Sequence, residues 1–454
     1  MQLIGVIPTF HPKIMDAMKL GTPTLFLLVM VLSCSPREDH VGETEISKWQ
    51  YGKKAAISIT LDDASINQFR QALPIMDTLG FKATFFIITN QVQHSVLQPQ
   101  FIGRPIEDVI KETAATPTNQ QNLFERASAI RFTGIRKAVE YHNNAGSLFE
   151  DGKTNEAFKI IDEAYAQVRK EKAFHRALNT STLNMITWPE LKAFAANGHE
   201  FGSHTLSHPR LSVLDEKNML YELEKSKEEI RNQLGAGQTF SAECPFGTEN
   251  ERVMSYAHQV YPALRNRMPE PFLEELNRGS AKTPGVFKKE YVQWQRGPLQ
   301  KTSMETMKSW VDTVLVQDNV WLCLTFHGVD GIGWEAKPHE ELAEYFKYMK
   351  EREARLWVAT FGDVTKYMRE RMSAKINVKE RGEKIVFTLD QSLDRSVYDL
   401  PLTLKTYVPS EWKEVMVKQG EKSAKLNPQS DKEGSYIMYQ VVPGGGEVEL
   451  APTH

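Results

Sequence analysis

The sequence predicts an α/β protein built around a sheet of parallel strands. Two short apolar runs of strand-forming residues, at 55–61 and 83–89, flank a segment at 67–79 whose apolar residues recur at helical spacing. A strand, a helix and a strand within about 35 residues form a βαβ unit, and such units place their strands parallel. The same alternation returns after residue 185.

The elements of this scaffold can be placed in order. Gly80 ends the first helix, whose apolar side chains are Phe69, Leu73, Ile75, Met76 and Leu79. Farther along the chain, the patterns predict helices at 188–197, 214–234 and 340–352, and strands at 199–203, 240–246, 320–327 and 356–361. These elements continue the βα alternation of the first unit.

Two segments depart from this rhythm. Residues 93–180 are polar and helix-prone, which predicts a helical hairpin inserted into the βα scaffold. After residue 373, short alternating segments are separated by Pro, Gly and Asp, which predicts a small antiparallel β domain. We therefore expect a scaffold at 54–372, interrupted by an insertion at about 93–180 and followed by a β domain at 373–454.

The N-terminus resembles a bacterial secretion signal. The apolar run at 25–32 is shorter than the roughly 20 residues that cross a bilayer, and Lys19 supplies a positive charge before it. Cys34 follows a small residue, as in a lipobox, where the cysteine is acylated; a cleaved signal with an incidental cysteine and a buried helix are the alternatives. We expect a signal at 1–33, whose true start lies within it, a polar tether at 34–53, and anchoring in the bacterial cell envelope through lipid on Cys34.

Composition and charge exclude several classes of protein. Hydrophobic residues make up 41% of the 454 positions and charged residues 25%, which excludes a disordered chain and a polytopic membrane protein. Lys and Arg number 55 against 58 Asp and Glu, so no positive excess exists to bind a phosphate backbone and no nucleic-acid partner is expected. Three cysteines cannot make a disulfide framework.

Two adjacent carboxylates, Asp62 and Asp63, follow the first predicted strand. Like charges at the end of an apolar strand are costly, because they repel each other and lose water, and a metal ion would relieve that cost. The alternative is a helix N-cap, since aspartate favours that position and a helix follows.

Three histidines also follow predicted strands. His204 and His208 are four residues apart in a segment that Pro209 keeps from being a helix interior, and two imidazoles in a loop can reach one metal ion together with an aspartate. His327 is the last residue of the strand predicted at 320–327 and precedes a glycine-rich turn. The alternatives are an idle, solvated pair for the first two and a satisfied core histidine for the third.

Four motifs in order resemble those of the polysaccharide deacetylases, the family of NodB-like carbohydrate esterases. They are TLDD at 60–63, HTLSH at 204–208, ECPFG at 243–247 and LTFH at 324–327. The resemblance covers about 54–92 and 185–370. It implies a distorted, incomplete (β/α) barrel, with a site formed by loops at the carboxyl ends of the strands.

The resemblance also implies the roles of the site residues. One divalent metal ion would be held by Asp63, His204 and His208; Zn²⁺ is the default for this donor set, and Co²⁺ or Ni²⁺ would suit it. Asp62 would be the general base and His327 the general acid. The remaining assignments are the oxyanion contact, at the backbone N–H of Phe246, and the substrate pocket, at Pro245, Gly247, Trp294, Asp330 and Trp334.

The sequence departs from the family pattern at the third motif. Glu243 stands where the family has an arginine that steadies the base, and Phe246 replaces a tyrosine. We expect Glu243 to point away from Asp62 and another cation, such as Arg296, to take the arginine's place. A further family motif with Asp and Trp is not evident, and Trp294 and Asp312 are the candidates for it.

The predicted function is the metal-dependent removal of N- or O-linked acetyl groups from a glycan. The alternatives are an allantoinase-like hydrolase of another C–N bond and a glycan-binding lipoprotein whose barrel has lost activity. The expected partners are an acetylated glycan and, through the lipid alone, a membrane.

Overall fold

The computed structural model describes residues 40–171, 186–269 and 272–453. Cys34 and the apolar run at 25–32 lie outside these ranges, as does the end of the predicted insertion. Among the described residues, no helix is both long enough and apolar enough to cross a membrane.

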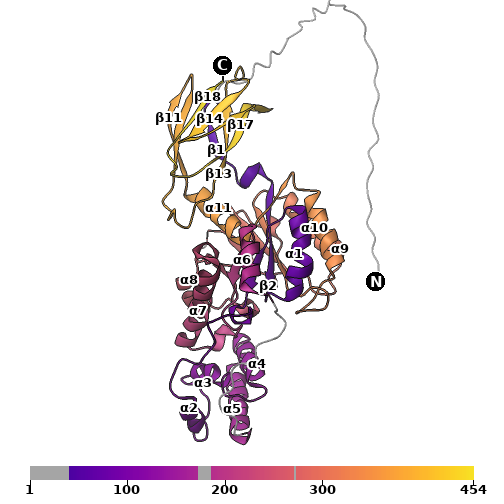
Figure 1. The fold of residues 1–454 in the computed structure, drawn as a ribbon, viewed down its shortest axis with the longest axis vertical. Coiled ribbons are helices and arrows are strands. Elements are labelled where there is room, and N and C mark those ends of the chain that lie inside the picture. The colour runs from indigo at the N-terminus through magenta and orange to yellow at the C-terminus, as the bar shows by residue number, and fades with distance from the viewer. Residues whose placement is uncertain (1–39, 172–185, 270–271, 454) are drawn as a thin grey trace, which may run out of the picture.

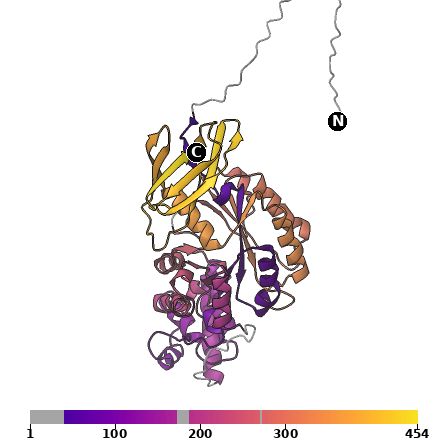
Figure 2. The ribbon, with the colours of Figure 1, turned by 45° about the horizontal axis from the view of Figure 1, so that its top comes forward.

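A nine-stranded parallel sheet forms the centre of the molecule (Figures 1 and 2). Eight strands lie in the order β6-β5-β4-β3-β2-β9-β8-β7, and β10 pairs with the first half of β2. β6 and β7 are the two outermost strands of this order. In the described part of the chain they do not pair with each other, so the sheet is an incomplete (β/α) barrel, as predicted. The strands are β2 (Ala55–Asp62), β3 (Thr84–Ile87), β4 (Glu200–Ser203), β5 (Ser241–Ala242), β6 (Ala263–Leu264), β7 (Glu274–Leu276), β8 (Val292–Arg296), β9 (Val320–Phe326) and β10 (Leu356–Val358).

Helices pack on this sheet because its strands are apolar on both faces. All eight residues of β2 are buried, as expected for a central parallel strand. Gly80, with φ +74°, ends α1 in the left-handed conformation that glycine adopts without strain. The helices outside the insertion are α1 (Leu73–Leu79), preceded by a π-helical turn at Gln68–Ala72, α6 (Trp188–Ala196), α7 (Glu216–Leu234), α8 (Glu251–Val260), α9 (Met304–Leu315), α10 (His339–Lys350) and α11 (Phe361–Ser373).

The insertion lies beyond the carboxyl ends of the parallel strands (Figure 1). Its α4 (Ala138–Glu150) and α5 (Thr154–Glu171) form the expected hairpin around a small apolar core. Two further helices, α2 (Ile106–Glu112) and α3 (Leu123–Ile130), pack beside it.

The C-terminal region is a β structure of two antiparallel sheets at the amino ends of the parallel strands (Figure 1). One sheet has the order β11-β12-β18-β14-β15 and the other β1-β13-β17-β16. The strands are β1 (Thr44–Ile46), β11 (Lys375–Arg381), β12 (Ile385–Asp390), β13 (Leu402–Val408), β14 (Val415–Gln419), β15 (Lys422–Leu426), β16 (Gln429–Asp431), β17 (Gly434–Val441) and β18 (Glu447–Pro452).

The prediction of a polar tether at 34–53 is wrong for its second half. Thr44–Ile46 pairs with β13, and Trp49 is fully buried, with its indole N–H donating to the carbonyl of Asp318 at 2.8 Å. The burial of one large aromatic ring and a strand pairing hold this segment to the fold despite its polar composition.

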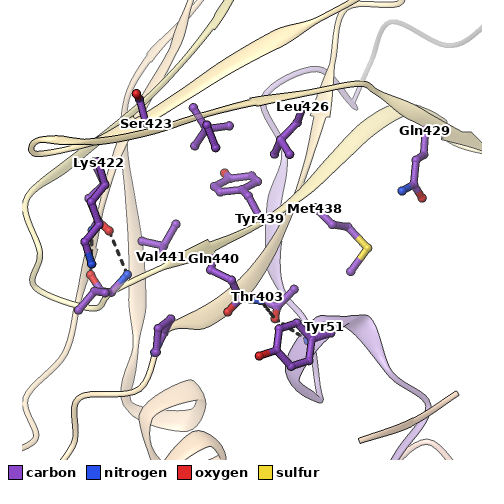
Figure 3. Close-up of a pocket in the computed structure, with 15 residues that line it drawn as sticks. Tyr51, Thr403, Lys422, Ser423, Leu426, Gln429, Met438, Tyr439, Gln440 and Val441 are labelled. Atoms are coloured by element: carbon purple, nitrogen blue, oxygen red, sulfur yellow. Dashed lines mark hydrogen bonds between the residues drawn. The ribbon is translucent and has the colours of Figure 1, made fainter. Parts of the chain in front are cut away.

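A cavity of about 600 Å³ lies between the two sheets of the β structure (Figure 3). β14 and β15 line one side of it and β17 the other, while Tyr51 lies at its edge with 58% of its surface exposed. The cavity is at the opposite end of the barrel from the carboxyl edge of the strands.

Candidate metal centre and active site

The carboxyl edge of the barrel brings together the five chemically important side chains that the sequence singled out. Asp62 ends β2 and Asp63 follows it; His204 and His208 follow β4, and His327 follows β9. The carboxyl ends of parallel strands meet at one edge of the sheet, which is why residues far apart in the chain converge here.

Asp63, His204 and His208 form a cluster that can hold a metal ion, with their ligand atoms all within 4.8 Å of one another. The Nε2 atoms of His204 and His208 lie 3.6 and 3.4 Å from Oδ1 of Asp63. The Nδ1 atom of His204 bonds to the carbonyl oxygen of Glu243 at 2.9 Å, so that nitrogen donates and Nε2 is left to face the cluster. Two imidazole nitrogens and one carboxylate oxygen are a donor set that fits Zn²⁺, Co²⁺ or Ni²⁺.

The electrostatics of the cluster also favour a bound cation. Burial raises the pKa of Asp63, although the charge of His204 opposes the rise, so its carboxylate would gain from a nearby cation. Burial lowers the pKa of His208 well below its usual value, which keeps the imidazole in the neutral form that binds metals. Asp63 and His208 also have positive φ values, +72° and +59°, a local strain of the kind found at functional sites.

Arg265, which the sequence analysis did not identify, is the cation that steadies Asp62. Its two terminal nitrogens donate to the two carboxylate oxygens of Asp62 at 2.8 and 2.6 Å, and one also donates to the hydroxyl of Thr60. Burial would raise the pKa of Asp62, but Arg265 and His327 outweigh it and lower that pKa. Asp62 is therefore held as a carboxylate.

The prediction that Arg296 would take this place is wrong. Its guanidinium donates to backbone carbonyls, including those of Arg278 and Ser280, and lies over the ring of Trp294. Arg296 therefore fixes a neighbouring loop instead of contacting the base.

The prediction that Glu243 points away from Asp62 is also wrong. Glu243 is 5% exposed, and its Oε1 lies 3.2 Å from the Arg265 guanidinium and accepts from Asn266 at 3.2 Å. Burial raises the pKa of Glu243 despite Arg265, because one guanidinium cannot neutralise two buried carboxylates and Asp62 has the bidentate contact. Of the two carboxyl groups, Glu243 is therefore the one whose neutral form is favoured.

His327 also lies next to Asp62. Its Nε2 is 3.4 Å from Oδ2 of Asp62, and its ring meets the ring of Trp334 edge to face at 4.6 Å. Burial lowers the pKa of His327 to about 4, with Arg278 and Arg265 adding to the effect and Asp62 opposing it. The imidazole is thus neutral in the free protein at neutral pH.

Phe246 and its neighbours form the wall beside the metal cluster. Phe246 has φ +63° and is 40% exposed, and its ring packs edge to face on His208 at 4.7 Å between centroids. Pro245 before it is buried, and Gly247 after it has φ +67°. The backbone predicted to bind the oxyanion therefore lies next to the cluster.

Two of the predicted supporting residues are placed differently, while Trp334 lies at the site as described above. Trp294 is 4% exposed and belongs to the barrel core, so it does not line an open pocket. Asp312 lies on α9, where it accepts from the hydroxyl of Tyr348 and does not contact the acid. Asp330 is exposed and bonds to the backbone and ring of His339, at the start of α10, and its place in the substrate pocket stays a prediction.

The insertion holds the loops that present the metal cluster. Arg131, which follows α3, donates to Oγ of Ser207 at 2.6 Å and to Glu222 of α7 at 3.1 Å, and both side chains of the Arg131–Glu222 ion pair are buried. Glu150 at the end of α4 pairs with Arg210 and accepts from Thr248 at 2.8 Å. The insertion thus braces the loop between His204 and Arg210, and the loop after Phe246, from outside the barrel.

The fold and the site together define a class of protein. Its members have an incomplete parallel barrel with an Asp-His-His cluster at the carboxyl edge of the strands. The family model described as polysaccharide deacetylase matches residues 50–122 and 142–261. This part of the chain thus carries a polysaccharide deacetylase domain, as its motifs predicted. The matched residues include both aspartates and both loop histidines, whereas Arg265 and His327 lie beyond them.

Individual relatives are distant. A gellan lyase from Bacillus sp is 25% identical over 404 residues, which are 81% of this chain and 16% of the lyase, so this chain spans a small part of that protein's length. A putative polysaccharide deacetylase from Mycobacterium smegmatis is 11% identical, with a TM-score of 0.36 over 72% of this chain and 94% of its own. A family 4 acetyl xylan esterase from Clostridium thermocellum, in complex with a cobalt ion, is 12% identical, with a TM-score of 0.31 over 68% and 89%.

Proposed function

We propose that this protein is a metal-dependent hydrolase that removes acetyl groups from a glycan. The observation that carries the proposal is the convergence of a metal-binding cluster, Asp63, His204 and His208, with a buried carboxylate and an imidazole 3.4 Å apart, Asp62 and His327. The polysaccharide deacetylase domain supports an acetylated glycan as the substrate.

Asp63, His204 and His208 would hold one divalent ion, with Zn²⁺ the default for these donors. When bound, such an ion supplies Lewis-acid chemistry at an acetyl carbonyl. Asp62 accepts the proton of the attacking water, and Arg265 keeps its carboxylate ionised and fixed in orientation for that step.

His327 returns a proton to the leaving oxygen or nitrogen of the sugar. Its imidazole is neutral in the free protein, so it must gain that proton during the reaction, and Asp62 is close enough to supply it. The backbone N–H of Phe246 would stabilise the negative charge that develops on the acetyl oxygen.

Acetate release from N-acetyl chito-oligosaccharides and O-acetylated xylan tests this proposal. Removing a general acid or base costs about 10²–10⁴-fold in rate, so Asp62→Asn and His327→Gln should each lose that much while the metal content stays near one ion per chain. Asp390→Asn, which changes an exposed carboxylate in the C-terminal β structure, is the matched control and should change the rate less than about twofold. Full activity of Asp62→Asn would contradict the proposal.

The same proposal places the enzyme in the bacterial cell envelope, anchored by lipid on Cys34. The apolar run at 25–32 and the small residue before the cysteine support it. Cys34→Ala should abolish acylation and move the protein to the soluble or unprocessed fraction; unchanged membrane partitioning would refute the anchor.

A further inference from the structure

Arg278, near the mouth of the site, differs from three nearby arginines that pair with carboxylates. Arg265 pairs with Asp62, Arg210 pairs with Glu150 and Arg131 pairs with Glu222. Arg278 follows β7, is exposed, and forms no ion pair with a carboxylate of any described residue. Within the described part of the chain, no carboxylate neutralises its positive charge, which is therefore available to a bound anion.

The fold leaves room for this side chain at the mouth of the barrel. A Cβ added at Gly297, just after β8, would lie 3.1 Å from Cδ of Arg278 and 2.9 Å from the carbonyl oxygen of Thr325. A Cβ at Gly247 would lie 3.8 Å from Nη2 of Arg278. The stem therefore lies over Gly297, and the guanidinium reaches the loop that carries Phe246.

The backbone under Arg278 is fixed as well. Arg296 donates to the carbonyl oxygens of Arg278 and Ser280 at 3.3 and 3.4 Å, and its own guanidinium is stacked 4.6 Å above the ring of Trp294. Because Trp294 belongs to the barrel core, this contact ties the loop after β7 to a rigid part of the fold. The backbone that carries Arg278 is thus held in place by Arg296.

The guanidinium also lies near the metal cluster. It reaches Gly247, the residue after Phe246, and the ring of Phe246 packs on His208 at 4.7 Å between centroids. A group bound to Arg278 would therefore lie at the same mouth of the barrel as the candidate metal ligands.

We propose that Arg278 binds an anionic substituent of the glycan, the carboxylate of a uronic acid unit next to the acetylated sugar. This rests on the proposed function and names its substrate class as acidic acetylated glycans. A guanidinium presents two parallel N–H donors that match the two oxygens of a carboxylate, and the charge-assisted contact gives both affinity and orientation.

The test measures binding and turnover separately, with the metal-loaded full chain. Calorimetry compares the binding of an oligogalacturonide and of its carboxyl-reduced, neutral form to the wild type, to Arg278→Gln and to Arg231→Gln, which removes an exposed arginine on α7 far from the barrel mouth. Acetate release is measured on acetylated polygalacturonate and on its carboxyl-reduced form.

Arg278→Gln loses one charge-assisted contact, so it should bind the oligogalacturonide about tenfold more weakly than the wild type. Its kcat/KM on the acidic glycan should fall by the same factor. Its kcat on the acidic glycan and its kcat/KM on the neutral glycan should change less than about twofold. Arg231→Gln should match the wild type. Arg278-dependent binding without acetate release from any glycan would refute the proposed function and support this inference.

Three results would overturn the inference. The first is acetate release that prefers the neutral glycan or is equally reduced on both glycans by Arg278→Gln. The second is the absence of oligogalacturonide binding to the wild type. The third is Arg278-dependent binding of a phosphorylated oligosaccharide but not of the uronide, which would assign a different anion.

Discussion

Replacing Arg265 with methionine should destabilise the fold more than any surface arginine change, because it leaves two carboxylates buried without a cation. The side chains of Arg265 and Asp62 are only 2% and 3% exposed, and the pair is bidentate at 2.6 and 2.8 Å. Breaking a buried pair of this kind costs about 3–5 kcal/mol. The free energy of unfolding in urea, compared with the wild type, measures the loss.

Arg267→Met is the matched control, two residues along the chain. Its ion pair with Glu251 has side chains that are 33% and 90% exposed, so its loss should cost less than about 1 kcal/mol. Glu243→Gln should also be mild, because burial already favours the neutral form of Glu243, and combined with Arg265→Met it should recover part of the lost stability. Equal losses for Arg265→Met and Arg267→Met would refute the reasoning.

Two further predictions concern buried charges away from the metal cluster. Arg131→Met should lower the free energy of unfolding by about 3–5 kcal/mol, because it leaves Glu222 buried without a cation. It should also lower acetate release, because Ser207 loses its hydrogen bond to Arg131. Loss of stability without loss of activity would show that the insertion does not support the site. Burial raises the pKa of Glu370 to about 7, so the folded state favours the protonated acid: this contribution to stability is complete below about pH 4.5 and is lost as the pH rises through 7. Glu370→Gln should make the urea midpoint of unfolding depend less on pH between pH 5 and 8. An unchanged pH dependence would contradict the raised pKa of Glu370.

The parts of the site that could be predicted are those encoded locally. Asp62 and Asp63 directly follow a strand, as His204 and His327 do, and a parallel sheet gathers such positions at one edge whatever its curvature. The residue types and spacing were therefore enough to place the metal cluster and the acid–base pair together.

The residues that were missed depend on the curvature of the sheet. Arg265 follows β6, which is four strands from β2 in the sheet order, and it reaches Asp62 only because the sheet curls and brings the carboxyl ends of β6 and β2 together. No local pattern marks that closure. The position of Glu243 depends on the same closure, because the cation that lets it approach Asp62 comes from the end of β6.

The braces from the insertion were missed for a related reason. Arg131 and Glu150 lie on a polar, helix-prone segment where charged side chains are normally solvated. Their partners come from loops more than 50 residues away, and only the packing of the hairpin against those loops brings them into contact.

Restoration of acetate release by added metal is the most direct test of the central claim. Protein treated with a chelator and then dialysed should release no acetate from acetylated glycans, and one equivalent of Zn²⁺ per chain should restore release in the wild type but not in His208→Ala. Acetate release that survives chelation, or that Zn²⁺ restores equally in His208→Ala, would contradict the account.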